Sequence, residues 1–589
     1  MKDYKRTHTC GDLRKSDVDT EVILSGWVGS RKDLGGLIFI YLRDRYGYTQ
    51  VIFDPKDLSK ESFKIAESLR YEYVITVKGV VSSRLAGQER KDMPTGEIEV
   101  RASELIILNE SKPLPFEIED DIHVSEEVRL KHRYLDLRRP KMQKMLELRA
   151  RTTQSIRNYL SENKFVEVET PMLTRSTPEG ARDFLVPSRM SKGHFYALPQ
   201  SPQLFKQLLM VAGMDKYFQI VKCFRDEDLR ADRQPEFTQV DIEASFIDVD
   251  DIIALIEGLI TTVYKEVLGK EVKAPFDRLD FEEAMDRFGC DKPDRRIPWE
   301  LKDLTKSLMK SSFQAFSKIA NDGGFVKGLN VEKLEQSRKD IEKLEEFAKK
   351  FGAKGLAWVK VKDGEWKSSI AKFISDDEKK EISKLLNVSE GDLFFIVADK
   401  NRGVVDTVLG ELRLKLAHEF GIVDKNRDDF LWVVNFPLLE WSGEEGRHVA
   451  VHHPFTAPHP DDIDKLKKGP HGIRSLGYDI ILNGNEIGGG SIRNHRADIQ
   501  SLVFKNLGIS DEEAKEKFGF LLNAFGFGAP PHGGLALGLD RWVMLMAGSD
   551  SIRDVIAFPK TTSASCLMTD APSTVSARQL DELNISLKK

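Results

Sequence analysis

The first hundred residues alternate short runs of apolar and β-branched residues with turns that contain glycine and aspartate. The runs are EVILSGWVGS, GLIFIYLRD, YTQVIFD, YEYVITVKGVV and GEIEVRASELIIL. Alternation of apolar and polar positions over runs of this length predicts β-strands. Five such strands within the first 105 residues predict a small closed barrel, and the OB-fold is the barrel that fits this number best.

The pattern changes three times along the rest of the chain. The acidic, proline-containing stretch KPLPFEIED ends the barrel, and a helical pattern from about residue 126 leads to the strand-like FVEVETPML. Residues 290–415 differ in character, and we interpret them as an inserted domain whose role the sequence does not indicate. A lysine- and glutamate-rich part of it predicts a helix with a solvated charged face. The apolar residues of this part keep helical spacing: Leu334, Ile341, Leu344, Ala348 and Phe351. The strand-like FLWVVNFPLLEW and GYDIILNGNEIGGGSIR and a helix around GLALGLDRWVMLMAG complete a multidomain α+β pattern.

Composition narrows the class of protein. The 589 residues exceed one hydrophobic core, and 40% hydrophobic with 31% charged residues is typical of a soluble globular chain. The net charge of -6 means that a nucleic-acid partner would have to bind local basic patches. The four cysteines form no CxxC pair, the N-terminus has no apolar signal region, and no apolar run approaches the ~18 residues that span a bilayer. We therefore expect a cytoplasmic protein that does not enter a membrane.

The stretch FRDEDLRADRQPEFTQVD, residues 224–241, predicts a charged hairpin. Period-two alternation places Gln219, Val221, Cys223, Arg225 and Glu227 on one face of the first strand and Phe237, Gln239, Asp241 and Glu243 on one face of the second. An antiparallel pair would then present an arginine, a glutamate and an aromatic ring together. The alternative is a solvated hairpin held by surface salt bridges.

A second hairpin is predicted at Asn483-Gly484, the strongest short turn signal. Regular pairing places Ile481 opposite Glu486 and Asp479 opposite Gly488, so that Asp479 and Glu486 are diagonal neighbours on one face. Two carboxylates this close favour a hard divalent cation, most simply Mg²⁺ bound with a polyphosphate. Gly488 and Gly490 on the same face would let a ligand approach the backbone. The alternative is an exposed acidic hairpin.

Three further segments carry candidate chemistry. Arg541 lies among apolar residues and must be paired or meet a ligand, with Asp540 as the alternative structural partner. In QSPQLFKQLL, Ser201 is the expected N-cap and Pro202 the first helical residue, and Gln203 and Lys206 then share one side that suits a small acidic solute, unless Lys206 is a surface lysine. In the barrel, Phe39 with Arg31 and Lys32 predicts a stacking and phosphate-binding surface, unless Phe39 is core.

These segments resemble the class II aminoacyl-tRNA synthetases. RDE with RQPEFTQVD is similar to motif 2 of that class, GLALGLDR to motif 3 and FVEVETPML to motif 1. TPEGARDF, QSPQLFKQ, HHPFTAP and GNEIGGGSIR are similar to the bacterial aspartyl subgroup. The resemblance covers essentially the whole chain and implies six regions: an anticodon-binding OB-fold (1–105), a hinge (106–140), a catalytic domain in two parts (141–289 and 416–560), an inserted GAD domain (290–415) and a C-terminal extension (561–589).

The resemblance also implies roles for individual residues, with Arg225 and Arg541 as the catalytic pair and Mg²⁺ at Asp479 and Glu486. It assigns ATP to Arg225, Asp226, Glu227, Gln234, Phe237, Glu486, Gly538, Leu539, Asp540 and Arg541. It assigns L-aspartate to Glu179, Gln203, Lys206, Arg225, Asp241, His452 and Arg493. It assigns the tRNA anticodon to Phe39, Gln50, Lys32 and Leu34. For His452 the alternative is a loop residue without a ligand contact.

Regular alternation in the second hairpin conflicts with one of these roles, because it turns Arg493 away from Glu486. We therefore predict a β-bulge or break within Gly488 to Ile492 that brings the Arg493 guanidinium to the side of the Glu486 carboxylate.

The implied function is activation of L-aspartate with ATP and transfer to the 3′ end of tRNA(Asp). Leu34 resembles enzymes restricted to tRNA(Asp), where relatives that also charge tRNA(Asn) often carry histidine. The alternatives are an enzyme that charges both tRNAs and a non-catalytic tRNA-binding paralogue, which would have no reason to retain the ATP residues. Pro171 resembles the motif 1 proline of the dimer interface, so a homodimer is expected.

Overall fold

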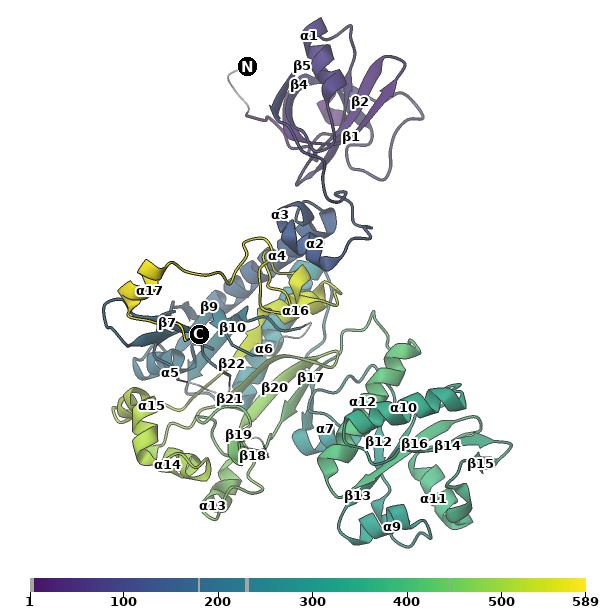
Figure 1. Cartoon of the computed structure of the whole chain (residues 1–589), viewed down its shortest axis with the longest axis vertical. Coiled ribbons are helices and arrows are strands. Elements are labelled where there is room, and N and C mark those ends of the chain that lie inside the picture. Colours follow the sequence, from purple (N-terminus) through teal and green to yellow (C-terminus); the bar gives the residue numbers. More distant parts are fainter. Residues whose placement is uncertain (1–4, 178–180, 228–231, 444, 589) are drawn as a thin grey trace. The chain divides into compact units, whose positions relative to one another are not determined.

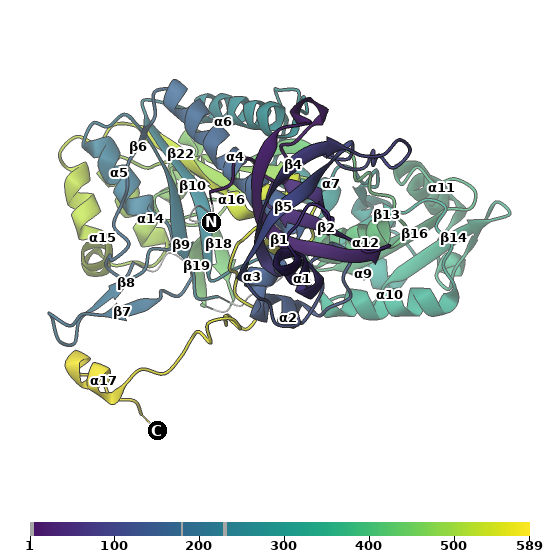
Figure 2. The same ribbon diagram turned by 90° about the horizontal axis from the view of Figure 1, so that it is seen from above.

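The structure is a computed structural model that describes residues 5–177, 181–227, 232–443 and 445–588. The chain folds as two compact units (Figures 1 and 2). The first contains residues 1–147, 557–561 and 565–572, and the second contains residues 148–556, 562–564 and 573–589. Among the described residues, no helix has both the length and the apolar character needed to cross a membrane.

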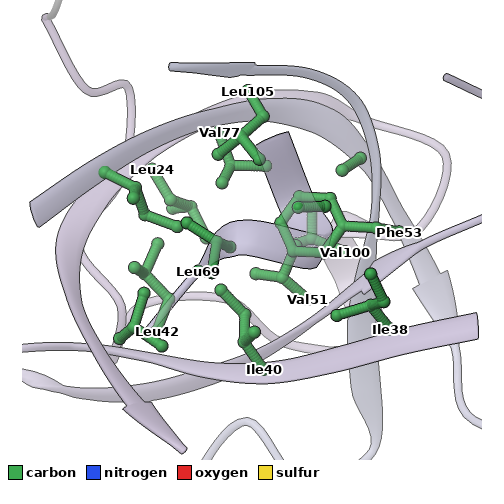
Figure 3. Close-up of a cluster of buried hydrophobic side chains, with 14 of the residues drawn as sticks. Leu24, Ile38, Ile40, Leu42, Val51, Phe53, Leu69, Val77, Val100 and Leu105 are labelled. Carbon is green, nitrogen blue, oxygen red and sulfur yellow. The ribbon is translucent and has the colours of Figure 1, made fainter. Parts of the chain in front are cut away.

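A closed five-stranded barrel forms the core of the first unit, as the alternating pattern predicts. Its strands follow the order β1-β2-β3-β5-β4, with β3 and β5 parallel. The strands are β1 (Glu21–Leu34), β2 (Leu37–Asp44), β3 (Gly47–Phe53), β4 (Val74–Ser83) and β5 (Ile98–Asn109), and α1 (Lys60–Ser68) lies between β3 and β4. Every second residue points inward, so that Leu24, Ile40, Val51, Phe53 and Val77 pack in one buried cluster (Figure 3).

The helical segment after the barrel begins with α2 (Glu126–Lys131) and α3 (Arg133–Asp136), followed by α4 (Pro140–Glu162). Asp136 is fully buried and accepts hydrogen bonds from Arg133 at 2.6 Å and from Arg139 at 2.7 Å. Two cations therefore compensate the burial of this one carboxylate.

An eight-stranded sheet is the centre of the second unit, with strand order β11-β17-β20-β21-β22-β10-β9-β6. In chain order the strands are β6 (Val166–Glu167), β9 (Lys216–Phe224), β10 (Glu236–Ser245), β11 (Asp277–Asp280), β17 (Phe430–Val434), β20 (Gly477–Leu482), β21 (Asn485–Ile492) and β22 (His532–Gly538). The helices α5 (Gln203–Val211), α6 (Val249–Val263), α7 (Phe281–Phe288) and α16 (Leu539–Met546) pack against it. Five adjacent strands, β20-β21-β22-β10-β9, thus bring both predicted hairpins into one sheet.

A separate five-stranded sheet of order β12-β13-β16-β14-β15 lies between α7 and β17 in the sequence. Its strands are β12 (Leu301–Asp303), β13 (Phe325–Asn330), β14 (Ala357–Lys362), β15 (Glu365–Lys367) and β16 (Leu393–Asp399). One buried cluster joins this sheet to α10 (Arg338–Lys350) and α12 (Arg402–Glu419), and another joins it to α8 (Thr305–Leu308), α9 (Gln314–Asn321) and α11 (Asp376–Leu385). Ile341, Leu344 and Ala348 are the buried residues of α10, as the helical spacing predicts.

The remaining elements of the second unit are shorter. They are the two-stranded pairs β7 (Leu185–Pro187) with β8 (Phe195–Ala197) and β18 (Leu439–Ser442) with β19 (Arg447–Ala450), and the helices α13 (Ile463–Leu466), α14 (Ala497–Asn506), α15 (Asp511–Phe525) and α17 (Ala577–Leu583). α14 and α15 share a buried cluster with Leu204 of α5, whereas α17 has no buried residue.

Candidate active site

The strands β9 and β10 pair as predicted and present the expected residues on one face. Cys223 lies opposite Phe237, Val221 opposite Gln239, and Gln219 opposite Asp241. The Arg225 guanidinium lies 5.2 Å from the centre of the Phe237 ring, within the range of a cation–π contact. The hairpin is therefore more than a solvated surface, because Arg225, Glu227 and Phe237 line a cavity of about 220 Å³, the Phe237 cavity.

The Phe237 cavity collects most of the residues predicted for ATP. Its wall includes Arg225, Glu227, Gln234, Phe237, Glu486, Gly538, Asp540 and Arg541. Asp226 is exposed and does not line the Phe237 cavity, because alternation along the chain turns it to the face opposite Arg225 and Glu227. Leu539 is 1% exposed and belongs to the core instead. Three residues of the predicted set, Arg225, Glu227 and Glu486, also line a second cavity.

Arg541 does not pair with its neighbour in sequence. Its Nη1 donates to the Glu486 carbonyl at 2.7 Å, and its Nη2 bonds Asp232 Oδ2 at 3.0 Å. Asp540 is buried, accepts a hydrogen bond from the Thr238 amide at 2.6 Å and pairs with Arg149. The alternative that Asp540 is the partner of Arg541 is therefore wrong, and the guanidinium remains a quarter exposed at the cavity wall.

The second cavity, of about 470 Å³, has a buried cluster of charges in its wall and is called the Lys206 cavity. Lys206 Nζ lies 2.8 Å from Asp241 Oδ1 and 3.4 Å from Glu243 Oε2. Arg493 donates to both oxygens of Glu243, at 2.9 and 3.0 Å. All four side chains are at most 2% exposed, so the alternative that Lys206 is a surface lysine is wrong, and two cations balance two carboxylates.

The electrostatics of this cluster fix its ionisation. Burial by itself would raise the pKa of Glu243, but Arg493 and Lys206 outweigh burial and hold the pKa below its ordinary value. Burial, followed by the charge of Arg493, holds the pKa of His453 well below its ordinary value, so the neutral ring accepts a hydrogen bond from Arg493. Among the described residues, Asp241 Oδ2 is buried and has no hydrogen-bond partner. The cluster therefore presents one unsatisfied acceptor beside two cations.

The hairpin β20–β21 turns at Asn483-Gly484, as predicted, with both residues at positive φ. Ile481 lies opposite Glu486, but the register shifts at the next pair, so that Ile480 lies opposite Gly488 and Asp479 opposite Gly489. The expected pairing of Asp479 with Gly488 is therefore wrong. The bulge falls at Ile487, one residue before the predicted range, because β21 must also pair with Leu537 of β22 through Gly488.

This bulge brings the predicted residues to one face. A methyl group built on Gly489 would point at Asp479 Oδ1, 2.4 Å away, and at Glu486 Oε1, 3.5 Å away. Gly489, and not Gly488 or Gly490, is thus the glycine beside the two carboxylates. Asp479, Glu486 and Arg493 all line the Lys206 cavity, which confirms the predicted side of the Arg493 guanidinium.

Asp479 and Glu486 have the electrostatics expected of a cation site. The charge of Asp479, followed by burial, raises the pKa of Glu486. His452 Nε2 lies 3.1 Å from Asp479 Oδ1, and although burial alone would lower the pKa of His452, this carboxylate raises it. His452 also lines the cavity, so it is more than a distant loop residue. Two neighbouring carboxylates and a glycine that leaves space beside them fit a hard divalent cation.

Two residues predicted for the aspartate site remain, Gln203 and Glu179. Gln203 is 6% exposed, lines the Lys206 cavity and donates to Gln207 at 3.1 Å. Helix α5 begins one residue later than expected, since Pro202 and not Ser201 occupies the N-cap position, and no side chain caps the helix. Glu179 lies outside the described residues.

Several residues of the site were missed from the sequence. They are Asp232, Glu243, Asp291, His453 and Ser491, which pair with predicted residues or line the same cavities. Glu243 was detectable, because it continues the alternation of Phe237, Gln239 and Asp241. The others come from loops or from the bulged strand, where periodicity carries no signal.

The barrel presents a separate candidate surface in the first unit. Phe39 pairs with Lys32 of β1 and with Ile52 of β3, and it points outward while Ile38 and Ile40 point into the core. The alternative that Phe39 is a core residue is therefore wrong. Leu34 is 60% exposed, and Gln50 donates to Glu99 at 2.9 Å. Aromatic and basic side chains thus share the outer face of β1–β3.

Comparisons with known proteins agree with this geometry. Residues 125–562 match the family described as tRNA synthetases class II (D, K and N), and residues 22–108 match the OB-fold nucleic acid binding domain. A protein of Desulfotalea psychrophila named aspartate--tRNA(Asp/Asn) ligase is 56% identical over 585 residues, covering 99% of this chain and 96% of that protein. A protein of the same name from Caldanaerobacter subterraneus is 56% identical over 584 residues, covering 99% and 98%.

Solved structures share the fold at low sequence identity. Asparaginyl-tRNA synthetase from Pyrococcus horikoshii, complexed with asparaginyl-adenylate, has a TM-score of 0.60 at 18% identity and covers 94% of this chain and 98% of that chain. A putative aspartyl-tRNA synthetase from Leishmania major Friedlin has a TM-score of 0.60 at 19% identity and covers 94% of each. The chain therefore belongs to the class II tRNA synthetases of the D, K and N family, enzymes that join an amino acid to tRNA with ATP.

Proposed function

We propose that the chain is an aspartate--tRNA ligase that forms aspartyl-adenylate from L-aspartate and ATP and then transfers aspartate to the 3′ end of tRNA(Asp). The observation that carries the choice of amino acid is the buried cluster of Lys206 and Arg493 in the wall of the Lys206 cavity. The names of the relatives that cover nearly the whole chain point to the same amino acid.

In this proposal the Phe237 cavity holds ATP and the Lys206 cavity holds aspartate. Arg225 belongs to both walls, so it can contact the α-phosphate and the α-carboxylate that attacks it. Phe237 would stack on adenine, Glu227 would contact its edge, and Arg541 would cover its other face. Gln203 and Asp241, whose Oδ2 has no partner among the described residues, would bind the α-ammonium group. Catalysis then depends on position and electrostatics, because the residues named here form no covalent intermediate.

Asp479 and Glu486 would hold Mg²⁺, which would neutralise charge on the phosphates during the displacement. Their fit rests on the carboxylate pair itself and on Gly489, where any side chain would fill the space beside Asp479. His452 would orient Asp479 through its hydrogen bond.

Selectivity against asparagine would come from Lys206 and Arg493, because only aspartate brings a further carboxylate to these two cations. A site built to bind a charged or hydrogen-bonding group can reject the analogue that lacks it by ~10⁴-fold. The first test is ATP–pyrophosphate exchange with purified protein, Mg²⁺ and either amino acid. Exchange that depends on aspartate and not on asparagine is expected, and exchange with neither would refute the proposed reaction.

A second candidate, charging of both tRNA(Asp) and tRNA(Asn), is favoured by the names of the relatives, whereas Leu34 favours tRNA(Asp) alone. Aspartylation of each purified tRNA separates the two. The outer face of β1–β3, with Phe39, Lys32, Leu34 and Gln50, is the proposed anticodon surface.

A homodimer is also proposed, and Pro171 is exposed, as an interface residue must be in the single chain.

A further inference from the structure

Residues 290–299 connect α7 to β12, the first strand of the inserted sheet, and they contact the active-site hairpin at two points. Asp291 is exposed and lines the Lys206 cavity together with Asp479 and Glu486. Asp294 packs against the turn of the same hairpin, since a methyl group added at Gly484 would lie 2.8 Å from its Cβ. This connection is therefore part of the cavity wall and not only a linker.

One arginine of the inserted domain holds this connection. Arg413, in the middle of α12, is 0% exposed and donates from Nε to the Trp299 carbonyl at 2.6 Å. Its Nη2 donates to the carbonyls of Asp294 and Ile297, both at 2.8 Å. Its guanidinium also lies 5.0 Å from the centre of the Phe288 ring. A single side chain thus fixes three backbone carbonyls within six residues.

The burial of Arg413 is costly, which argues that its geometry matters. Its three acceptors are neutral carbonyls, and burial lowers its pKa to about 10. A buried cation without a carboxylate partner destabilises a fold unless it is fully hydrogen-bonded. Among the described residues, its Nη1 has no hydrogen-bond partner. An apolar residue of similar size would pack here at lower cost but would leave the three carbonyls unbound.

The backbone of α12 also lies directly on the start of the connection. Gly289 ends α7 at a φ of +72°, and a methyl group there would lie 2.2 Å from the Asp406 carbonyl oxygen. A methyl group on Gly410 would lie 3.0 Å from the Phe288 carbonyl oxygen. The two glycines allow a close approach of backbones that no larger residue would permit.

Ion pairs hold the other end of α12 to α7. Lys327 of β13, 2% exposed, lies 2.7 Å from Asp406 and 3.1 Å from Asp286. Arg402 lies 2.7 Å from Glu282 and 2.9 Å from Asp286. α7 and the connection therefore contact α12 from Arg402 to Arg413. These contacts join the inserted domain to the wall of the Lys206 cavity.

We propose that the inserted domain is a positioning element of the amino-acid site: Arg413 sets the path of residues 290–299 and so places the Asp291 carboxylate in the Lys206 cavity, where it attracts a cationic group of the substrates. Two sources supply such a group, the α-ammonium of the amino acid and the divalent cation carried by ATP. This inference rests on the proposed function, because it assigns a role within the aspartate site. Arg413 acts through the connection and is a positioning residue, whereas Asp291 contacts the substrate.

Two binding measurements on the full-length protein distinguish the sources. Calorimetric titration with aspartate, without nucleotide or metal, reports the α-ammonium contact. Paramagnetic resonance titration with Mn²⁺ in the presence of a non-hydrolysable ATP analogue reports the cation contact. Asp291→Asn is expected to weaken one of these affinities by about fivefold or more, the lower end of typical couplings between sites. Glu335→Gln, an exposed carboxylate of the inserted domain, is the matched control and leaves both affinities unchanged.

Arg413→Met removes the three hydrogen bonds and is expected to weaken the same affinity as Asp291→Asn. It is also expected to speed amide hydrogen exchange in residues 290–299 while α10 stays protected. Lys339→Met, on the exposed face of α10, controls for loss of a cation. If Arg413→Met does not fold, Arg413→Lys takes its place. It keeps the charge but replaces the two donor nitrogens of the planar guanidinium by one, so a smaller effect in the same direction is expected.

The outcomes are distinct. Wild-type levels of both affinities in Asp291→Asn would overturn the contact, and unchanged affinity with faster exchange in the Arg413 variant would overturn the positioning role. Wild-type protein without aspartate-dependent exchange of pyrophosphate would instead refute the proposed function itself.

Discussion

Gly489→Ala tests the geometry of the carboxylate pair with the smallest possible change. The added methyl group would lie 2.4 Å from Asp479 Oδ1, so this oxygen must retreat by about 1 Å to reach ordinary van der Waals contact. Gly489 has no positive φ, so alanine adds no backbone strain. The methyl group therefore displaces mainly the tip of one side chain that binds His452 and would bind Mg²⁺.

The magnitude follows from the sensitivity of catalysis to position. A displacement of about 1 Å near reacting groups can lower the rate ~10²-fold, which corresponds to about 2.7 kcal/mol of transition-state stabilisation. The expected result is a fall of this order in aspartate-dependent pyrophosphate exchange, partly restored at high Mg²⁺, with an unfolding temperature close to that of the wild type. Exchange and unfolding are measured on the same preparation, by isotope incorporation and by calorimetry.

Two other glycines provide the controls. Gly490→Ala would place its methyl group 2.1 Å from the Gly534 carbonyl oxygen, a backbone atom, so this variant is expected to lose stability as well as activity. Gly355→Ala has no atom within 4 Å of the new methyl group and is expected to change neither. Full exchange activity in Gly489→Ala would mean that the Asp479 carboxylate does not need its present position, and the assignment of the cation site would fail.

Three further predictions concern other parts of the chain. Phe39→Ala is expected to weaken charging of tRNA by the ~1–3 kcal/mol of one stacked base, with pyrophosphate exchange unchanged; an equal fall in both activities would contradict an outer-face role. Arg493→Met leaves Glu243 buried with Lys206 as its only cation, so the free energy of unfolding in urea is expected to fall by about 3 kcal/mol; an unchanged midpoint would show that the pair adds no stability. Sedimentation is expected to show a dimer at micromolar concentration, and a stable monomer would refute the role given to Pro171.

The parts of the site that follow regular strands could be predicted from the sequence. Alternation places Arg225, Phe237 and Asp241 on one face. The antiparallel register of β9 and β10 confirms it for Phe237 and Asp241, and Arg225 lines the same cavity as Phe237. The closed barrel and the turn at Asn483-Gly484 follow in the same way, because both depend on local periodicity and turn chemistry. The class II family and the choice of an enzyme are confirmed by the comparisons.

The parts that depend on distant segments could not be predicted. The bulge at Ile487 depends on the alignment of β21 with β22, which lies some 50 residues further along the chain. The partner of Arg541 is Asp232, which lies 309 positions away and follows no periodicity. The role of residues 290–299 depends on Arg413, whose three carbonyl partners lie 114 to 119 positions before it. The six domain boundaries remain a prediction.

The charge-balanced cluster in the Lys206 cavity has a consequence for how its specificity can change. Each of its four members pairs with another: Lys206 binds Asp241, and Arg493 is the bidentate partner of Glu243. Replacement of one member leaves its partner as a buried charge without its counter-ion. A single substitution is therefore expected to lower the stability of the fold more than replacement of both members of the pair. A lineage that drifted toward a neutral amino acid would therefore need coordinated replacements at two positions, and each intermediate would be less stable than either end point. The proposed preference for an acidic ligand should therefore outlast changes in the proposed anticodon surface of the barrel, where Lys32 and Leu34 are exposed and their replacement leaves no buried charge.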